Sequence, residues 1–389
     1  MTDSIVIVAA RRTAIGSFQG QFSALKAPAL GSQAIAAAVA DAGIDGSDIN
    51  EVIMGCVLPA GAGQGPARQA ALGAELPLQV GCTTINKVCG SGMKAVMFGH
   101  DLIRTGSANI VVAGGMESMT NAPYLVDRGL RMGHAKLLDH MFFDGLQNPY
   151  DGNMMGHFGE QCVARYGFTR EQQDDFSRAS VERANAAIAE GRFSEEIAPV
   201  TISSRRGDTT VDTDEEPARC NIEKMPSLRP AFARDGTITA ASSSKISDGA
   251  AALVLMSESE ADRRGLKPLA RIVAHAGHAQ EPEWFTTAPV GAMRKVLEQA
   301  GWHADTVDLY EINEAFATVT MAAMSELSLD HAKVNVHGGA CALGHPIGAS
   351  GARILVTLLH ALKAHGKKTG VASLCIGGGE ATAVAVELY

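Results

Sequence analysis

One set of local patterns occurs twice in this chain, in the same order, and this repeat limits the possible folds. The first copy has a helix ending in Ala42-Gly43 and a turn containing Ser91-Gly92, and the second has a helix ending in Ala300-Gly301 and a turn containing Ser350-Gly351. Matching positions are about 260 residues apart. Such an ordered run indicates duplication of one α/β unit. The two halves should pack about a pseudo-dyad, with these turns close to it.

Each copy alternates between apolar strands and helices. The first predicts strands at 5–9, 51–58 and 109–113 and helices at 28–42, 66–73 and 93–102. The second predicts a helix at 292–301 and strands at 307–312 and near 371–375. The strand at 109–113 is expected to stop at Gly114-Gly115. Continuous Val/Ile strands between helices are typical of an α/β fold whose sheet is covered on both faces.

A different kind of sequence separates the two copies. Residues 118–247 contain polar loops and mostly helical fragments, including an amphipathic stretch at 169–190. The strand pattern resumes at 248–257 and completes the first half. We therefore predict three parts, since loops that contact ligands are usually carried on a rigid scaffold. They are an N-terminal α/β half (1–117 and 248–268), an inserted loop domain over the active site (118–247) and a C-terminal α/β half (269–389).

The net charge and the cysteine content limit the classes of binding partner and the cellular compartment that the sequence predicts. The formal net charge of −9 argues against nucleic acid or an anionic membrane surface as the main partner. No apolar run approaches the roughly 20 residues of a membrane span, and the N-terminus lacks the basic region and apolar core of a signal peptide. The seven cysteines include no CxxC pair, which predicts a reduced, cytoplasmic protein. Metal-ligand spacing is absent, so no structural zinc is expected.

The first candidate for chemistry is Cys89, which lies between a polar run and a helix. Gly90 and Gly92 remove Cβ bulk where the backbone is expected to turn sharply. A cysteine at a helix start faces unpaired N–H groups and the positive end of the helix dipole, and both favour the nucleophilic thiolate. On this stretch alone, an inert, buried cysteine is an equally good interpretation.

Three further candidates lie in the second half. Asn313 is expected either to hold a water or to cap a helix, and alone the cap is favoured. His345, followed by Pro346 and flanked by glycines just before a helix, is poorly explained as packing. Cys375 ends a buried strand before three glycines, whose free N–H groups can stabilise an oxyanion. The alternative for Cys375 is again a small buried hydrophobe.

Taken together, these four segments resemble those of thiolases. The resemblance covers essentially the whole chain and extends to the segment 228–232 in the inserted region. It implies a five-layered αβαβα fold built from duplicated βαβαβαββ halves. It also implies a homotetramer, or at least a dimer, that acts on acyl-CoA and CoA as substrates and needs no cofactor.

The resemblance implies a role for each candidate. Cys89 attacks the substrate carbonyl carbon, His345 takes the thiol proton, and Cys375 is the second acid/base. His345 and a water held by Asn313 serve the enolate oxygen. The backbone N–H groups of Cys89 and Gly377 serve the tetrahedral intermediate.

Residues that contact CoA are also implied by the resemblance. Ser244 would bond the pantetheine, and Arg219 would lie near the adenine or its phosphates. Phe232, Ala315 and Phe316 would line the pantetheine tunnel. The alternatives are that the serine run of 242–244 forms turns and that Arg219 is solvated.

Two positions depart from the best-known short-chain biosynthetic thiolases. Met154 stands where they commonly have His, and Phe285 stands where they often have Met. Both residues are expected to shape the acyl pocket. The leading hypothesis is an acetoacetyl-CoA thiolase, an acetyl-CoA C-acetyltransferase. The alternative is a 3-ketoacyl-CoA thiolase of fatty-acid β-oxidation with longer or branched substrates.

Two other hypotheses fit the residues less well. Relatives that use acyl-carrier-protein substrates usually pair the nucleophile with two histidines or with His and Asn, and Cys375 argues against them. A non-catalytic, lipid-binding relative would be expected to have lost Cys89, His345 or Cys375, and this chain keeps all three.

Overall fold

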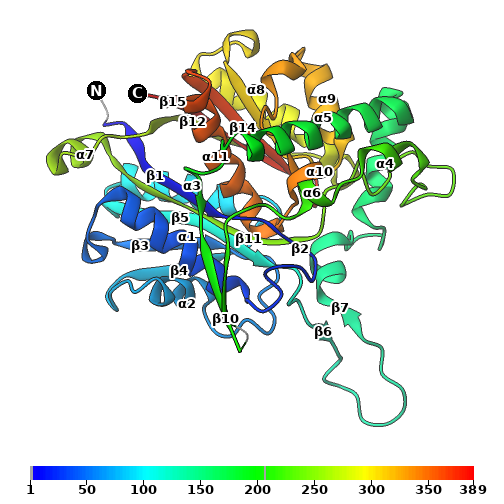
Figure 1. The fold of residues 1–389 in the computed structure, drawn as a ribbon, viewed down its shortest axis with the longest axis horizontal. Helices are drawn as coiled ribbons and strands as arrows, with labels where there is room; N and C mark the ends of the chain where they lie inside the picture. The colour runs from blue at the N-terminus through cyan, green and yellow to red at the C-terminus, as the bar shows by residue number, and fades with distance from the viewer. Residues whose placement is uncertain (1–2, 206) are drawn as a thin grey trace.

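A long mixed β-sheet runs through the molecule and is covered by helices (Figure 1). This computed structural model describes residues 3–205 and 207–389. Met1 and Thr2 of the predicted N-terminal half, and Arg206 of the predicted inserted domain, lie outside the described residues.

The elements have the following bounds. The strands are β1 Ile5–Thr13, β2 Gly16–Ser17, β3 Glu51–Gly55, β4 Gly81–Ile85, β5 Ile110–Ser118, β6 Tyr124–Leu125, β7 Leu138–Asp139, β8 Ile197–Ala198, β9 Val200–Ser204, β10 Gly207–Val211, β11 Ser247–Ser257, β12 Ala270–Ala279, β13 Leu309–Ile312, β14 Thr369–Ile376 and β15 Glu380–Leu388. The α-helices are α1 Ala27–Ala42, α2 Pro66–Gly73, α3 Ser91–Arg104, α4 Met155–Tyr166, α5 Arg170–Ala189, α6 Glu216–Arg219, α7 Glu258–Arg264, α8 Ala288–Ala300, α9 Ala317–Leu327, α10 Ala340–Leu343 and α11 Ile347–Ala364.

The order of the main strands shows the two halves. It is β13-β14-β15-β12-β1-β11-β5-β3-β4, and the halves join where β1 pairs with β12. In the first half the chain order is β1-α1-β3-α2-β4-α3-β5-β11, which is the predicted βαβαβαββ unit. In the second half the strand that would match β4 is reduced to one bridge between Tyr310 and Val334. The predicted duplicated fold is confirmed, and the second half differs from the first in having this one strand reduced to a bridge.

Five layers result from this arrangement, as predicted. Helices α1 and α2 pack on the outer face of the N-terminal strands, and α8 and α9 pack on the outer face of the C-terminal strands. Helices α3 and α11 lie between the two sets of strands in a shared central core. Val112 packs in the outer core, whereas Val111 and Ala113 pack in the central one. Because successive strand residues point to opposite faces and both faces are buried, the strands are continuously apolar.

The two central helices, α3 and α11, cross at two glycines that occupy matching positions in the internal repeat. A Cβ on Gly92 would lie 2.8 Å from the backbone nitrogen of Ala352, and one on Gly351 would lie 2.5 Å from that of Met93. Each glycine therefore allows the backbone of the other helix to approach closely. This reciprocal contact agrees with the predicted pseudo-dyad.

The strand β5 is longer than predicted. It does not stop at Gly114-Gly115 but continues to Ser118. A Cβ on Gly114 would lie 2.0 Å from the carbonyl oxygen of Ala251, and one on Gly115 would lie 2.1 Å from that of Gly348. These glycines therefore admit β11 and α11 instead of ending the strand. In contrast, β3 ends at Gly55, three residues before the predicted end.

The segment between the halves is mostly helix, loop and short ribbons. Helix α5 begins after Thr169, whose side chain forms a capping box with Gln172, and it confirms the amphipathic helix predicted there. Strands β6 and β7 form an arm that extends away from the body (Figure 1). The division at 117/118, 247/248 and 268/269 stays a prediction. Among the described helices, α11 alone is long and apolar enough to cross a bilayer, and 83% of its residues are buried in the protein.

Candidate active site

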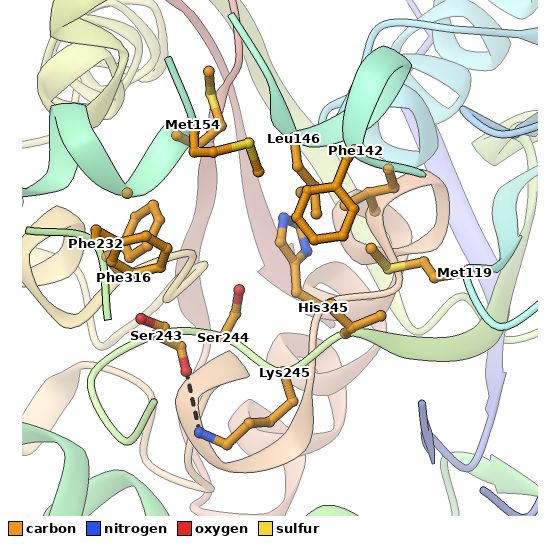
Figure 2. A pocket seen from close by; sticks show the side chains of 14 residues that line it. Met119, Phe142, Leu146, Met154, Phe232, Ser243, Ser244, Lys245, Phe316 and His345 are labelled. Atoms are coloured by element: carbon orange, nitrogen blue, oxygen red, sulfur yellow. Dashed lines mark hydrogen bonds between the residues drawn. The ribbon is translucent and has the colours of Figure 1, made fainter. Parts of the chain in front are cut away.

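One cavity of about 200 Å³ lies between the inserted segment and the C-terminal half. Figure 2 shows Phe232 and Phe316 on one side, Phe142 and Leu146 on the other, and the ring of His345 between them. The full lining is Met119, Phe142, Leu146, Met154, Met155, Gly156, Phe232, Ser243, Ser244, Lys245, Ile246, Phe316, His345 and Ile347. The wall is mainly apolar, with a few polar groups near His345.

His345 is buried and directly precedes α11. Its Nδ1 lies 2.5 Å from Oγ of Ser350, and that hydroxyl donates its proton to the carbonyl oxygen of Pro346 at 2.9 Å. With the single hydroxyl proton of Ser350 on the bond to Pro346, Nδ1 of His345 is the donor in the first contact. Nε2 is then the unprotonated nitrogen, and it has no hydrogen-bond partner. Ser350 therefore holds the imidazole in the tautomer that a base requires.

The electrostatics of His345 favour the same state. Burial lowers the pKa of His345 to about 3, and the nearby charge of Arg353 acts in the same direction. The ring is therefore neutral near pH 7, with a lone pair on Nε2 that can accept a proton.

The turn that carries Cys89 is strained at the preceding residue. Val88 has φ of 47°, in the left-handed region that β-branched residues rarely adopt. Asn86 Oδ1 accepts the N–H of Val88 at 2.8 Å, and Oγ of Ser91 donates to the carbonyl oxygen of Val88 at 2.7 Å. Backbone strain of this kind costs about 1–3 kcal/mol and is concentrated at functional sites.

Gly90 of this turn removes Cβ bulk, as predicted, and the structure shows which neighbour requires it. Gly90 has φ of −81°, so it does not supply an unusual backbone angle. A Cβ on Gly90 would lie 2.3 Å from Cδ1 of Ile376. The glycine therefore admits the end of β14, which brings the Cys375 strand against the Cys89 turn.

The thiol of Cys89 is not acidic at rest, contrary to the prediction from its helix position. Burial raises the pKa of Cys89 to about 11, although the backbone N–H groups of Gly377 and of Cys89 itself act in the opposite direction. Desolvation thus outweighs the dipole of the helix start. Cys89 therefore needs a base, and its two neighbouring N–H groups point to an oxyanion site.

Cys375 is the second-to-last residue of β14 and is fully buried, close to Cys89. Burial raises the pKa of the Cys375 thiol well above its usual value, and charge on Cys89 raises it further. Cys375 belongs to an apolar cluster that includes Phe316, and Cys89 packs against one that includes Met119 and Ile347; these three residues line the cavity. Neither thiol is itself among the lining residues, so both lie behind the cavity wall.

Asn313 is fully buried just after β13, and neither its Oδ1 nor its Nδ2 has a protein partner. The helix that follows has Phe316 at its N-cap, so the alternative that Asn313 caps a helix is wrong. A buried amide without protein partners is the group expected to hold a water molecule.

The predicted CoA residues divide into two sets. Ser244, Phe232, Phe316 and Met154 line the cavity. Ala315 lies behind it, where its carbonyl oxygen accepts the N–H of Ser244 at 3.0 Å.

Phe285 and Arg219 also lie outside the lining. Phe285 is buried behind the wall, where its ring packs edge-to-face on Phe158 at 6.3 Å between centroids. Arg219 is exposed and pairs with Glu215 at 3.1 Å, which agrees with the solvated alternative, and its contact with CoA stays a prediction.

Sequence reasoning missed Glu117, a buried carboxylate on β5. It accepts the N–H groups of Val57 at 2.9 Å, Leu58 at 3.2 Å and Gly348 at 2.9 Å. These contacts tie the first half to the start of α11, directly after His345. Burial raises the pKa of Glu117 to about 7. A glutamate within an otherwise apolar strand was the signal for it in the sequence.

Most of the remaining lining also escaped prediction. Met119, Phe142 and Leu146 come from the inserted segment. Ser350, which contacts His345 but does not line the cavity, comes from the first turn of α11 and was also missed. Ser350 follows His345 by five residues, so its position in the first helical turn after His345 could have predicted the contact between them. The apolar residues had no such signal. Among the described residues, the one cluster with metal-ligand geometry lies elsewhere, on α3 and β12.

Comparison with protein families identifies the chain. The models of the thiolase N-terminal and C-terminal domains match residues 5–259 and 266–388. The chain belongs to the thiolase family. An acetyl-CoA acetyltransferase of Pseudomonas aeruginosa is 49% identical over 98% of each chain, and one of Cupriavidus necator is 50% identical over 100% of each.

Solved thiolase structures have the same fold. A thiolase from Ascaris suum in complex with coenzyme A is 44% identical, with a TM-score of 0.94 over 99% of this chain and 100% of that one. An acetyl-CoA acetyltransferase from Bacillus anthracis is 40% identical, with a TM-score of 0.97 over 100% of this chain and 99% of that one. The thiolase resemblance of the sequence motifs is thereby confirmed.

Proposed function

We propose that this thiolase is an acetyl-CoA acetyltransferase that forms and cleaves acetoacetyl-CoA reversibly. The observation that carries the proposal is the neutral His345, which lines the cavity and whose Nε2 has no partner, together with two thiols packed behind the same wall. The names of the relatives support the same activity.

The first half-reaction transfers an acetyl group to Cys89. Nε2 of His345 accepts the thiol proton, because the pKa of Cys89 is too high for the thiolate to be abundant near pH 7. The thiolate then attacks the thioester carbonyl of acetyl-CoA. The N–H groups of Cys89 and Gly377 stabilise the oxyanion. CoA leaves as a thiol by taking the proton of Cys375, which becomes a thiolate, while the proton of Cys89 stays on Nε2 of His345.

The second half-reaction forms the carbon–carbon bond. The thiolate of Cys375 removes an α-proton from a second acetyl-CoA, and the high pKa of this thiol makes its thiolate a strong base. A water on the free amide of Asn313, together with the N–H now on Nε2 of His345, stabilises the enolate oxygen. The enolate carbon attacks the acetyl group, and the expelled Cys89 thiolate takes its proton back from His345. These groups supply the nucleophile, the bases and the oxyanion donors, so the reaction needs CoA only as a substrate and no cofactor.

The size of the cavity favours short acyl groups. About 200 Å³ is small for a ligand site, and Phe142, Leu146 and Met154 occupy its wall (Figure 2). A 3-ketoacyl-CoA thiolase acting on longer or branched chains is the second candidate, because Met154 is an adaptable, apolar side chain in place of His.

Thiolysis of 3-ketoacyl-CoA substrates of increasing chain length separates these two functions. We expect the highest kcat/KM for acetoacetyl-CoA, and a steady rise with chain length would support the second candidate. Absence of turnover for every substrate would contradict both. In Cys89→Ala, radiolabelled acetyl-CoA should leave no covalent label, whereas Cys82→Ala, at a partly buried cysteine outside the cavity, should label normally.

We further propose a cytoplasmic homotetramer. The support for assembly is the β6–β7 arm, where Val126, Leu130, Met132 and Leu137 are exposed apolar residues. The seven free cysteines support a reducing compartment. Light scattering should give the mass of four chains, and Met132→Glu with Leu137→Glu should reduce it; a monomeric parent protein would contradict the assembly.

A further inference from the structure

Two histidines and one aspartate converge at a point well outside the thiolase site. His100 and Asp101 lie on α3, and His275 lies on β12. Nδ1 of His100 lies 3.0 Å from Oδ1 of Asp101, and Nε2 of His275 lies 2.9 Å from the same oxygen. The two ring nitrogens are 3.1 Å apart. The three atoms thus form a nearly equilateral triangle.

An irregularity in β12 places His275 on this face. The pairing of β12 with β15 shifts register between Ile272 and Ala274, so Val273 is the extra residue of a β-bulge. Ile272 packs in the central core, whereas Val273 and Ala274 both pack with the outer core. His275 therefore turns back towards the central side, where α3 lies. Bulges frequently re-aim a side chain in this way beside functional sites.

Hydrogen bonding alone accounts poorly for this geometry. In one arrangement, His100 and His275 would each donate an N–H to Oδ1 of Asp101. The two N–H groups would then approach that oxygen at an acute angle to each other and would be crowded together. Two neutral rings could instead place one proton between their nitrogens, but a carboxylate oxygen would then face a bare nitrogen. Each arrangement leaves at least one unfavourable contact.

A metal ion removes this conflict. Imidazole nitrogens and carboxylate oxygens bind first-row ions at about 2.0–2.2 Å. Ligands at right angles around such an ion lie about 3 Å apart, which is the separation of all three atom pairs. The two rings are also nearly perpendicular, at 83°, with centroids 4.7 Å apart. Two imidazoles can therefore direct their lone pairs at one ion without overlap.

The surroundings leave space for the remaining ligands. The side chains of His100 and His275 are 16% and 17% exposed, and that of Asp101 is 50% exposed. A cavity of about 470 Å³ opens beside both histidines. Water can therefore complete the coordination of an ion held by three protein ligands.

We propose that His100, Asp101 and His275 form a binding site for a divalent first-row transition ion such as Zn²⁺, Ni²⁺ or Co²⁺. Two nitrogen ligands and one oxygen ligand suit these ions better than Mg²⁺ or Ca²⁺. The ion joins α3 of the N-terminal half to β12 of the C-terminal half, so it stabilises the packing of the two halves. It takes no part in the thiolase reaction. The sequence does not reveal the site, because the two histidines are far apart in the chain.

Co²⁺ is a direct probe of this site. The full-length protein, freed of metal with a chelator and desalted, is titrated with cobalt chloride. We expect one equivalent to bind, with visible d–d bands but without the intense near-ultraviolet band of a thiolate ligand. The unfolding temperature should rise by about 3 °C or more at saturation, since the ion binds the folded chain. Absence of stoichiometric binding, or a thiolate band that disappears in Cys89→Ala, would overturn the proposal.

Variants distinguish this cluster from other surface histidines. His275→Ala, His100→Ala and Asp101→Asn should each weaken Co²⁺ binding at least tenfold and abolish the thermal shift. His303→Ala, at an exposed histidine outside the cluster, should change neither. Thiolysis kinetics measured with chelator present should be the same in all of them. Unchanged Co²⁺ binding in both His275→Ala and His100→Ala would refute the site. Two positions are tested so that the result does not depend on a single variant, which could fail to fold.

Discussion

The tautomer of His345 depends on one hydroxyl group, and removing it should slow catalysis. In Ser350→Ala, Nδ1–H of His345 loses its acceptor in a fully buried setting. An unsatisfied buried donor costs about 1–3 kcal/mol. The ring avoids this cost only by moving its proton to Nε2, which removes the base that Cys89 needs. Because about 1.4 kcal/mol corresponds to a factor of ten in rate, we expect acetylation of Cys89 to slow by roughly 5- to 150-fold.

Rapid-quench measurement of acetyl-enzyme formation is the appropriate assay, since that step includes the proton transfer from Cys89. KM for acetyl-CoA should change little, because Ser350 does not line the cavity. Ser350→Thr restores the hydroxyl and should recover part of the rate. The matched control is Ser32→Ala, which removes a helical serine that donates to the carbonyl oxygen of Ala29 far from the site. If Ser350→Ala acetylates within twofold of the parent rate, the tautomer argument is wrong.

Three other predictions follow from the same geometry. Cys375→Ala should still be acetylated at Cys89 but should fail to exchange the α-protons of acetyl-CoA, as followed by NMR in D₂O; normal exchange would refute its role as a base. Gly92→Ala places a Cβ 2.8 Å from the backbone of α11, so it should lower the free energy of unfolding in urea by about 1–3 kcal/mol. Gly277→Ala, whose Cβ would have its nearest contact at 3.8 Å, should leave the free energy of unfolding unchanged. The pKa of His345 is lowered from 6.5 to about 3, so the unfolded chain binds more protons between these values. The His345 contribution to stability is therefore full above about pH 6.5 and decreases as the pH falls towards 3. His345→Gln should have a shallower loss of stability in that range than the parent, and an identical slope would contradict the assignment.

Much of the architecture could be predicted because it follows from local periodicity. The continuous apolar strands, the Ala42-Gly43 helix end and the capping box at Thr169 each depend on residues within one turn or one strand. The paired glycines at 92 and 351 predicted the central contact because duplication repeats the same steric requirement. Strand ends were less predictable: Gly114-Gly115 looked like a terminus, yet these glycines accommodate neighbouring backbones from distant parts of the chain.

Local sequence patterns were thus sufficient to predict the duplicated α/β units and the candidate reactive groups, Cys89, Asn313, His345 and Cys375. The properties of those groups depend on the folded structure. Burial raises the pKa of Cys89 despite its helix start, and Ser350 selects the tautomer of His345. The bulge in β12 likewise brings His275 to α3. Local patterns report the backbone conformation of neighbouring residues, whereas desolvation and proximity depend on every segment that packs around a group.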